Sequence, residues 1–243
     1  MKNNLNTIII ASAIILSVFI AAAAFKYKSK ASETIVVTGL AERSFTSDQI
    51  VWSASFSRTG LDLPAVYASL KADESEIKKY LTGNGIADSS IIFSSIDIQK
   101  NYREVYDENG RQRSSEFSGY TLTGNVTVDS RDIQKVEKLS REITGLLEKG
   151  IELNSRAPNY YYTRLNELKI DLLAKAAQDA KLRAETIAQN SKTSLGSIKK
   201  ANMGVFQITG KNSNEEFSYG GSFNTSSKAK TASITLRVEY MVR

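Results

Sequence analysis

Residues 164–189 read RLNELKIDLLAKAAQDAKLRAETIAQ, and this stretch contains neither Gly nor Pro. Its apolar residues recur every three or four positions, which predicts a single helix with an apolar stripe along one side. The stripe consists of Leu165, Leu168, Leu172, Ala176, Ala177, Ala180, Ala184, Ile187 and Ala188. It changes from Leu to Ala along the helix, and small side chains let a helix approach a flat partner closely. We therefore expect the Ala half to lie against a sheet that joins the first and last strands of the chain.

The composition narrows the chemistry that this protein can perform. The chain has 243 residues, of which 41% are hydrophobic and 24% are charged, as in an ordinary folded domain. It contains no Cys and no His, which excludes thiol nucleophiles, disulfides, imidazole bases and nearly all zinc sites. We accordingly predict no catalytic residues, no bound metal and no cofactor.

The net charge of +6 is concentrated at one end of the chain. Four lysines and no acidic residue lie in residues 1–30, so the remaining residues carry 28 basic and 26 acidic side chains. A nucleic-acid-binding domain would carry its basic excess on the folded part. We therefore do not expect a nucleic-acid partner.

Residues 8–25, IIIASAIILSVFIAAAAF, contain no charged side chain. At about 1.5 Å per residue, a helix of this length just crosses a bilayer core of roughly 30 Å. Two interpretations stay open: a signal peptide cleaved near the small residues 21–24, or an uncleaved membrane anchor. Lysines at 26, 28 and 30 follow the segment, which by the positive-inside rule opposes export, yet the signal-like Ala run favours it. Residues 1–32 are thus predicted as signal peptide or anchor with a tether, and residues 33–243 as the folded domain.

Periodicity and turn signals place further elements along the domain. Two helices besides the first are expected, one at 62–81 with Asp62 as its cap and Pro64 in its first turn, and one at 131–149 capped by Ser130. Residues 210–228 are polar and predict a mobile loop. Strands are expected at 33–40, 49–58, 90–106, 111–129, 151–162 (interrupted by Pro158), 198–208 and 230–243.

This order predicts an α+β protein built from two interleaved lobes. Residues 48–158 read strand, helix, strand, strand, helix, strand, which is the split βαβ or ferredoxin-like arrangement. Residues 33–47 and 159–243 would form a second, smaller antiparallel sheet covered by the long Ala-rich helix. The hydrophobic N-terminal helix precedes both lobes.

The strands at 90–106 and 111–129 are much longer than usual, so their hairpin is expected to project from the domain. Asn109-Gly110 is a strong signal for the turn between them. Two interpretations are weighed evenly: charged edges that discourage aggregation, or an arm that contacts a neighbouring subunit. The charged residues near the tip are Arg103, Glu104, Asp107, Glu108, Arg111, Arg113 and Glu116.

Three Ser-x-x-Lys pairs offer the clearest candidate chemistry: Ser75–Lys78, Ser197–Lys200 and Ser227–Lys230. In a Ser-Lys acylating enzyme, the Lys lies one helical turn from the Ser and takes its proton. Only the first pair falls on a predicted helix. Its charged neighbours indicate a solvent-exposed helix face better than a metal or acid–base site. These neighbours are Lys71, Asp73, Glu74, Glu76 and Lys79.

Other motifs are more readily explained by packing than by ligand binding. Residues 160–162 are three Tyr between Arg156 and Arg164, and a packed edge or subunit contact is favoured over stacking on a ligand. Trp52 alternates with apolar residues and is predicted to be core. Gly83-x-Gly85 follows a helix and precedes a strand, the wrong order for a dinucleotide-binding loop.

A set of small motifs occurs in a distinctive order along residues 33–243. They are Ile35-Val36-Val37-Thr38-Gly39, Asp48, Gly85-Ile86, Gly119-Tyr120, Gly150, Ala177-x-Asp179-Ala180-x-x-x-Ala184-Glu185-x-x-Ala188 and Leu195-Gly196. In these features the chain resembles the SIMPL-domain family, the YggE-like exported bacterial envelope proteins. It departs from the family at Ser47, where Pro is usual, and at Phe93-Ser94, where Thr is usual.

The resemblance implies an α+β fold, an envelope location facing the periplasm and assembly into ring- or channel-like oligomers. It also implies a link to oxidative-stress or envelope-stress defence, and it brings no established catalytic motif. Our first hypothesis is a non-enzymatic envelope protein that forms a homo-oligomer and meets the membrane through residues 8–25. The alternatives are a binding module for a small ligand or envelope polymer in a groove between the lobes, and, last, a Ser-Lys hydrolase.

Overall fold

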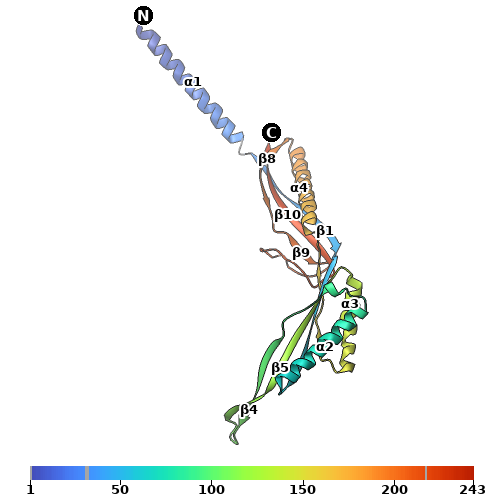
Figure 1. The fold of residues 1–243 in the computed structure, drawn as a ribbon. Helices are drawn as coiled ribbons and strands as arrows, with labels where there is room; N and C mark the ends of the chain where they lie inside the picture. The colour runs from blue at the N-terminus through green and yellow to red at the C-terminus, as the bar shows by residue number, and fades with distance from the viewer. Residues whose placement is uncertain (1, 31–32, 217) are drawn as a thin grey trace.

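The computed structural model describes residues 2–30, 33–216 and 218–243, except for the side chains of residues 2–9 and 26–30. The predicted tether at residues 31–32 lies outside the described residues. The described part is an α+β fold with two antiparallel sheets and four α-helices. Figure 1 shows the two sheets one after the other, with a hairpin at the far end of the molecule.

The terminal sheet contains both ends of the folded domain. Its strands are β1 (Thr34–Thr46), β8 (Leu195–Met203), β9 (Gln207–Gly210) and β10 (Ala229–Val242). β10 lies in the middle and pairs with β1 from Thr34↔Met241 to Thr46↔Ala229, so the first and last strands are joined as expected. The single strand predicted at 198–208 is wrong. It is divided near Gly204, where an added Cβ would lie 2.2 Å from Thr235 Oγ1.

Helix α4 (Leu165–Asn190) covers this sheet with the predicted apolar stripe. An added Cβ at Gly39 in β1 would lie 2.1 Å from the carbonyl oxygen of Ala176 and 2.6 Å from the amide nitrogen of Ala180. The Ala half therefore lies directly against β1, as predicted. Ile187 is an exception, because 44% of its surface is exposed. The buried residues of α4 are Leu168, Leu172, Ala176, Ala180, Ala184 and Ala188.

The middle sheet has the strand order β3-β5-β2-β6, with β4 beside β5 and β7 beside β2. The ferredoxin-like description itself stays a prediction. The continuous strand expected at 90–106 is wrong, because the chain leaves the sheet between β3 and β4, whereas the break expected at Pro158 separates β6 from β7. The strands are β2 (Gln49–Gly60), β3 (Ile91–Phe93), β4 (Asp97–Tyr106), β5 (Gln112–Ser130), β6 (Leu153–Ser155) and β7 (Asn159–Tyr161).

Helices α2 (Leu63–Gly83) and α3 (Ile133–Glu142) pack on one face of the middle sheet, and a 3₁₀ segment, η2 (Ile143–Lys149), continues α3. Asp62 caps α2 as predicted, accepting the N–H of Ala65 at 3.2 Å. The cap predicted for α3 is wrong: Asp132 accepts the N–H of Lys135 at 3.1 Å, while Ser130 only accepts the N–H of Asp132. Trp52 is confirmed as core.

The two segments of the chain that connect the sheets are hydrogen-bonded to each other. The Asp48 carboxylate accepts the N–H of Thr163 at 2.7 Å and its hydroxyl at 2.8 Å. The N–H of Ser47 donates to the carbonyl of Lys228 at 2.9 Å. A Pro at position 47, as in the family pattern, has no N–H to make this bond. The Ser47 hydroxyl is buried without a hydrogen-bond partner among the described residues.

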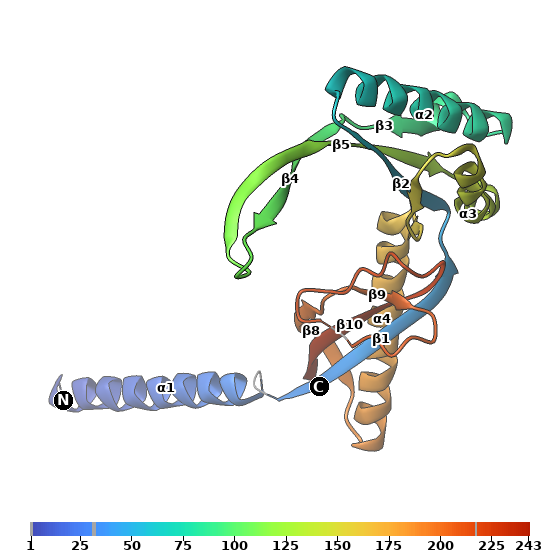
Figure 2. The ribbon, with the colours of Figure 1, turned by 90° about the horizontal axis from the view of Figure 1, so that it is seen from below.

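The predicted apolar segment at residues 8–25 forms part of helix α1 (Lys2–Lys30). Figures 1 and 2 show α1 extending away from both sheets. Within the part of the chain that the structure describes, no helix is both long and apolar enough to cross a membrane.

Candidate functional site

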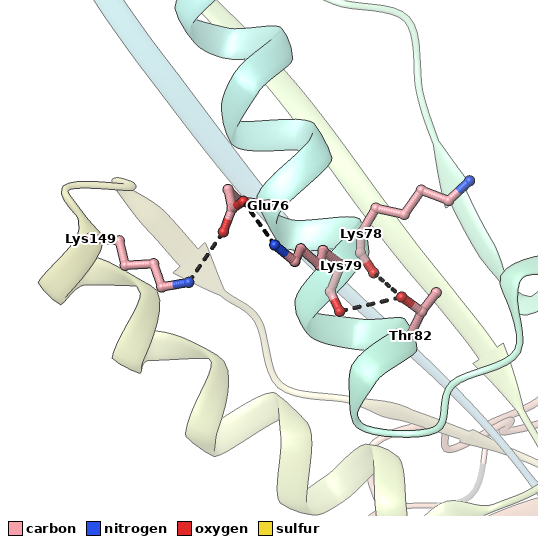
Figure 3. Close-up of polar contacts among 5 residues, drawn as sticks. All are labelled: Glu76, Lys78, Lys79, Thr82 and Lys149. Atoms are coloured by element: carbon pink, nitrogen blue, oxygen red, sulfur yellow. Dashed lines mark hydrogen bonds and ion pairs between the residues drawn. The ribbon is translucent and has the colours of Figure 1, made fainter.

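The helical Ser-x-x-Lys pair is not arranged for proton transfer. The ammonium group of Lys78 lies 2.7 Å from the Asp88 carboxylate, and both side chains are exposed. Figure 3 shows the Lys78 amine directed away from the other four side chains drawn, while Glu76 bridges Lys79 and Lys149. Among the described residues, no hydrogen bond joins Ser75 to Lys78. Lys78 is therefore paired with Asp88 and not with Ser75, whose proton a general base would have to reach.

The other two Ser-x-x-Lys pairs also lack the required arrangement. Ser197 and Lys200 lie on β8 with exposed side chains, and no hydrogen bond joins them among the described residues. Lys230 is only 2% exposed, and its amine donates to the backbone and side-chain oxygens of Asn224. Burial lowers the pKa of Lys230 from its ordinary value. This lysine holds the loop between β9 and β10 and does not face solvent.

One acidic residue of the charged helix face is buried, which corrects the sequence interpretation. Asp73 is 5% exposed and makes a two-pronged contact with Arg58, with Nε–Oδ2 2.6 Å and Nη2–Oδ1 2.8 Å. The hydrogen bond to Asp73 raises the pKa of Arg58. Glu74 pairs with Lys71 on the exposed side, as expected. Across the described residues, no group of three acidic side chains is placed to hold a metal ion.

The three consecutive Tyr residues belong to the junction between the sheets. The Tyr160 hydroxyl donates to Glu137 at 2.9 Å, and burial raises the pKa of Tyr160. The Tyr162 ring packs on Phe45 with 4.8 Å between centroids. The structure therefore confirms a packed edge at this position.

The polar loop at residues 211–228 covers part of the terminal sheet beside a hollow of about 440 Å³. The side chain of Gln207 lines this hollow, but both of its ends bind the loop. Its Nε2 donates to Ser218 at 2.7 Å, and its Oε1 accepts the N–H of Ser222 at 2.7 Å. The hollow lies on the terminal sheet and not in the groove between lobes that the sequence suggested. Gln207, one of the two buried polar residues of its lining, is engaged within the protein, so this geometry gives the binding-module alternative little support.

The hairpin of β4 and β5 leaves the middle sheet where β2 ends. At Gly119, which has φ +131°, an added Cβ would lie 2.7 Å from the carbonyl oxygen of Gly60, the last residue of β2. Beyond this point β5 is exposed along residues 112–118. Figure 2 shows the two strands curving away from the helices as a free arm. We call residues 97–118 the arm.

The tip of the arm has the turn predicted from Asn109-Gly110. Gly110 has φ +73°, and the Asp107 carboxylate accepts the N–H groups of Asn109 at 2.9 Å and Arg111 at 2.8 Å. Both of these hydrogen bonds are local to the tip and involve no residue of the body of the protein.

Aromatic side chains continue from the core onto the arm. Tyr102 lies opposite Phe117 with 6.0 Å between ring centroids, and Phe117 lies 5.0 Å from Tyr120, which packs against the core of the middle sheet. Tyr102 and Tyr106 are each 57% exposed. The sequence interpretation weighed only the charges of this hairpin. The alternation of Ile98, Tyr102 and Tyr106 with polar residues along β4 was the available signal.

The family profile SIMPL, described as "Protein of unknown function (DUF541)", matches residues 35–240. The chain belongs to the SIMPL family. No curated protein matches the chain. The most specific motif of this SIMPL domain has a packing function: Ala180 contacts Gly39, and the Asp179 carboxylate accepts the N–H of Leu40 on β1 at 2.8 Å. Arg183 holds the same carboxylate at 2.8 Å.

Proposed function

We propose that this SIMPL protein is a non-enzymatic protein of the bacterial cell envelope that assembles with copies of itself through the arm. The observation that supports this most strongly is the uncovered aromatic surface of the arm. An isolated two-stranded hairpin is only marginally stable in water, and an exposed apolar patch commonly marks an interaction site. A second copy of the same chain is always exported to the same compartment, so we propose it as the partner.

Sedimentation of the full-length protein in mild detergent tests the assembly. We expect an oligomer for the wild-type chain and a monomer when residues 101–119 are replaced by a two-residue Asn-Gly turn, which joins the paired residues Lys100 and Tyr120. The thermal unfolding of that variant should stay close to wild type, because the arm lies outside both cores. Leu182→Ser is a matched control, since this exposed apolar side chain lies on α4. Assembly that survives loss of the arm contradicts the proposal.

The envelope location rests on residues 8–25 and on the family resemblance. In this proposal the segment directs export and is either removed as a signal peptide or kept as the part that meets the membrane. Mass spectrometry of the native N-terminus separates these outcomes. Recovery of the protein from the cytoplasm with an intact N-terminus contradicts export.

The non-enzymatic part of the proposal is tested with a fluorophosphonate probe, and we expect no labelled Ser. A role in oxidative-stress or envelope-stress defence comes from the family resemblance alone. Survival of cells that lack the protein, measured under peroxide and under detergent, tests that role. Equal survival with and without the protein contradicts it.

A further inference from the structure

Strand β4 is an edge strand. Its pairing partner is β5, from Asp97↔Thr123 to Tyr106↔Gln112, and among the described residues no strand pairs with its other side. Free strand edges readily accept a further strand, and natural proteins usually protect them with bulges, prolines or covering segments. The two bulges recorded in this hairpin arise from extra residues on β5, so β4 runs without interruption. It therefore offers a regular edge of ten residues.

We propose that β4 of one copy pairs with β4 of a second copy, antiparallel, around a two-fold axis beside Tyr102. The two arms then form one four-stranded ribbon. This inference rests on the proposed self-assembly and specifies its contact. An isologous interface of this kind uses the same patch on both copies and closes at two. Assemblies larger than a dimer would then contain an even number of copies.

The side chains of β4 are complementary to themselves in this register. Two antiparallel strands related by a two-fold axis place opposite residues on the same face of the sheet. With Tyr102 opposite Tyr102 of the partner subunit, Lys100 lies opposite the partner's Glu104. Ile98 lies opposite the partner's Tyr106. Apolar thus meets apolar, and a cation meets an anion, in each of the two symmetric halves. Such cross-strand pairs are the main side-chain contribution to sheet pairing.

The neighbouring registers lack this complementarity. An axis beside Arg103 places Arg103 opposite Arg103 of the partner subunit, and Lys100 opposite the partner's Tyr106. An axis beside Asn101 places Ile98 opposite the partner's Glu104, which sets an apolar side chain against a charge. The first shift is disfavoured because like charges directly opposite each other destabilise a sheet, and the second because it leaves Ile98 and Glu104 without a complementary partner.

One pair in the proposed register is unfavourable, and the structure shows why its cost is limited. Asp97 would lie opposite the partner's Asp107 at each end of the ribbon. The carboxylate of Asp107 is already bound by the N–H groups of Asn109 and Arg111 in its own turn. It is therefore directed into the turn and away from the strand edge.

The absence of Cys from the sequence makes the register directly testable in the full-length chain. Opposite residues in an antiparallel pair have Cα atoms about 4.5–5.5 Å apart, within the roughly 4.4–6.8 Å that a disulfide spans. Tyr102→Cys should therefore give a covalent dimer on mild oxidation with copper phenanthroline. Arg103→Cys is the matched control, because its two copies would be about 8 Å apart, too far for a disulfide. Equal cross-linking at both positions would overturn the register.

Two further measurements test the register even if the Tyr102→Cys variant no longer assembles. Ile98→Cys chains mixed with Tyr106→Cys chains should form a heterodimer disulfide. Lys100→Glu should weaken assembly about tenfold by replacing attraction with repulsion in both halves. The double variant Lys100→Glu with Glu104→Lys should restore it. Failure of the double variant to recover overturns the inference.

The outcomes for the register and for the proposed function are distinct. If the wild-type chain is a monomer at every concentration, the proposed self-assembly fails. If it assembles, loses assembly without the arm, and yet forms neither disulfide, only the β4–β4 register fails.

Discussion

The two sheets are covered by helices in opposite ways. On the terminal sheet, α4 lies so close to β1 that an added Cβ at Gly39 would meet the backbone of Ala176 at 2.1 Å. On the middle sheet, α2 and α3 are held away by large side chains such as Trp52, Phe56 and Leu70, all of them buried. The interface of α4 with the terminal sheet depends on the lack of a side chain at positions such as Gly39. The interface of α2 and α3 with the middle sheet depends on large side chains that fill the space between them. They should therefore fail under opposite kinds of substitution.

The largest effect is expected from truncating the filled interface. Trp52 is 1% exposed, and its indole N–H donates to Ser155 at 3.0 Å. Trp52→Ala should lower the free energy of unfolding by about 3–5 kcal/mol, because it leaves a cavity and removes one of the two hydrogen bonds of the Ser155 hydroxyl, which still donates to Ser140. Urea denaturation of the full-length protein measures this. Ala184→Gly makes the matched truncation in α4 and should cost only about 1 kcal/mol. Similar losses of stability for Trp52→Ala and Ala184→Gly would contradict the difference between the two interfaces.

The next effect comes from adding one carbon to the close interface. Gly39→Ala should cost about 2–3 kcal/mol, because the atoms that the new Cβ meets include backbone that cannot rotate away. Gly83→Ala is the control, since a Cβ at that position at the end of α2 meets nothing within 4 Å. The control should leave stability unchanged or slightly raised. A neutral Gly39→Ala would show that α4 and β1 separate easily.

Adding a larger side chain from the helix side tests the same contact with a smaller expected effect. Ala180→Leu should cost about 1–3 kcal/mol, since Ala180 is fully buried against β1. Gln178→Leu places the same side chain on the exposed side of α4 and should change stability by less than about 0.5 kcal/mol. Thermal unfolding of both variants measures the difference. Equal changes in stability for the two variants would mean that a larger side chain fits between the Ala stripe of α4 and β1 without cost.

Periodicity was sufficient to predict the helix α4, its face and the joining of the first and last strands. It failed where a charged residue occupies an apolar position. The buried residues of α2 are Val66, Leu70, Asp73, Ile77 and Leu81, so Asp73 has the spacing of a core residue. Its charge led to the opposite prediction, because its partner Arg58 lies on another element. Lys230 is a second case: it continues the buried alternation of Ala232 and Ile234 in β10. A charged residue at a position with the spacing of core residues indicates a hydrogen-bonding partner elsewhere in the chain. The local sequence does not identify that partner.

The breaks within predicted strands and the site on the arm were harder to predict for a different reason. Whether residues 94–96 and 204–206 stay in a sheet depends on the strands beside them, which lie far away in sequence. The arm's length and turn were predictable from local signals. Its aromatic residues are evident in the sequence of β4, but that they stay uncovered follows only from the arrangement of the helices, which cover the body of the sheet and not the arm.

The smallest effect on stability is expected for the hydrogen bond between Asp179 of α4 and the N–H of Leu40, at the edge of the interface between α4 and β1. The N–H of Leu40, assisted by Arg183, holds the pKa of Asp179 below its ordinary value. A carboxylate with a lowered pKa in the folded state adds stability above its unfolded pKa of about 3.9, and this stability is lost as the pH falls through the folded pKa. Asp179→Asn should therefore cost about 0.5–1 kcal/mol at neutral pH. The variant should also lose less stability than wild type between about pH 5 and about pH 3.

The control for Asp179 is Asp171→Asn, on the same helix. Asp171 pairs with the side chains of Lys175 and Arg43, but it accepts no backbone N–H among the hydrogen bonds described. Both carboxylates have a lowered pKa, so the two variants separate a backbone contact from exposed ion pairs. Added salt should weaken the contribution of Asp171 more than that of Asp179, because exposed pairs are screened. Identical pH and salt profiles would show that the edge of β1 gains nothing from Asp179, and that α4 is held by close packing alone.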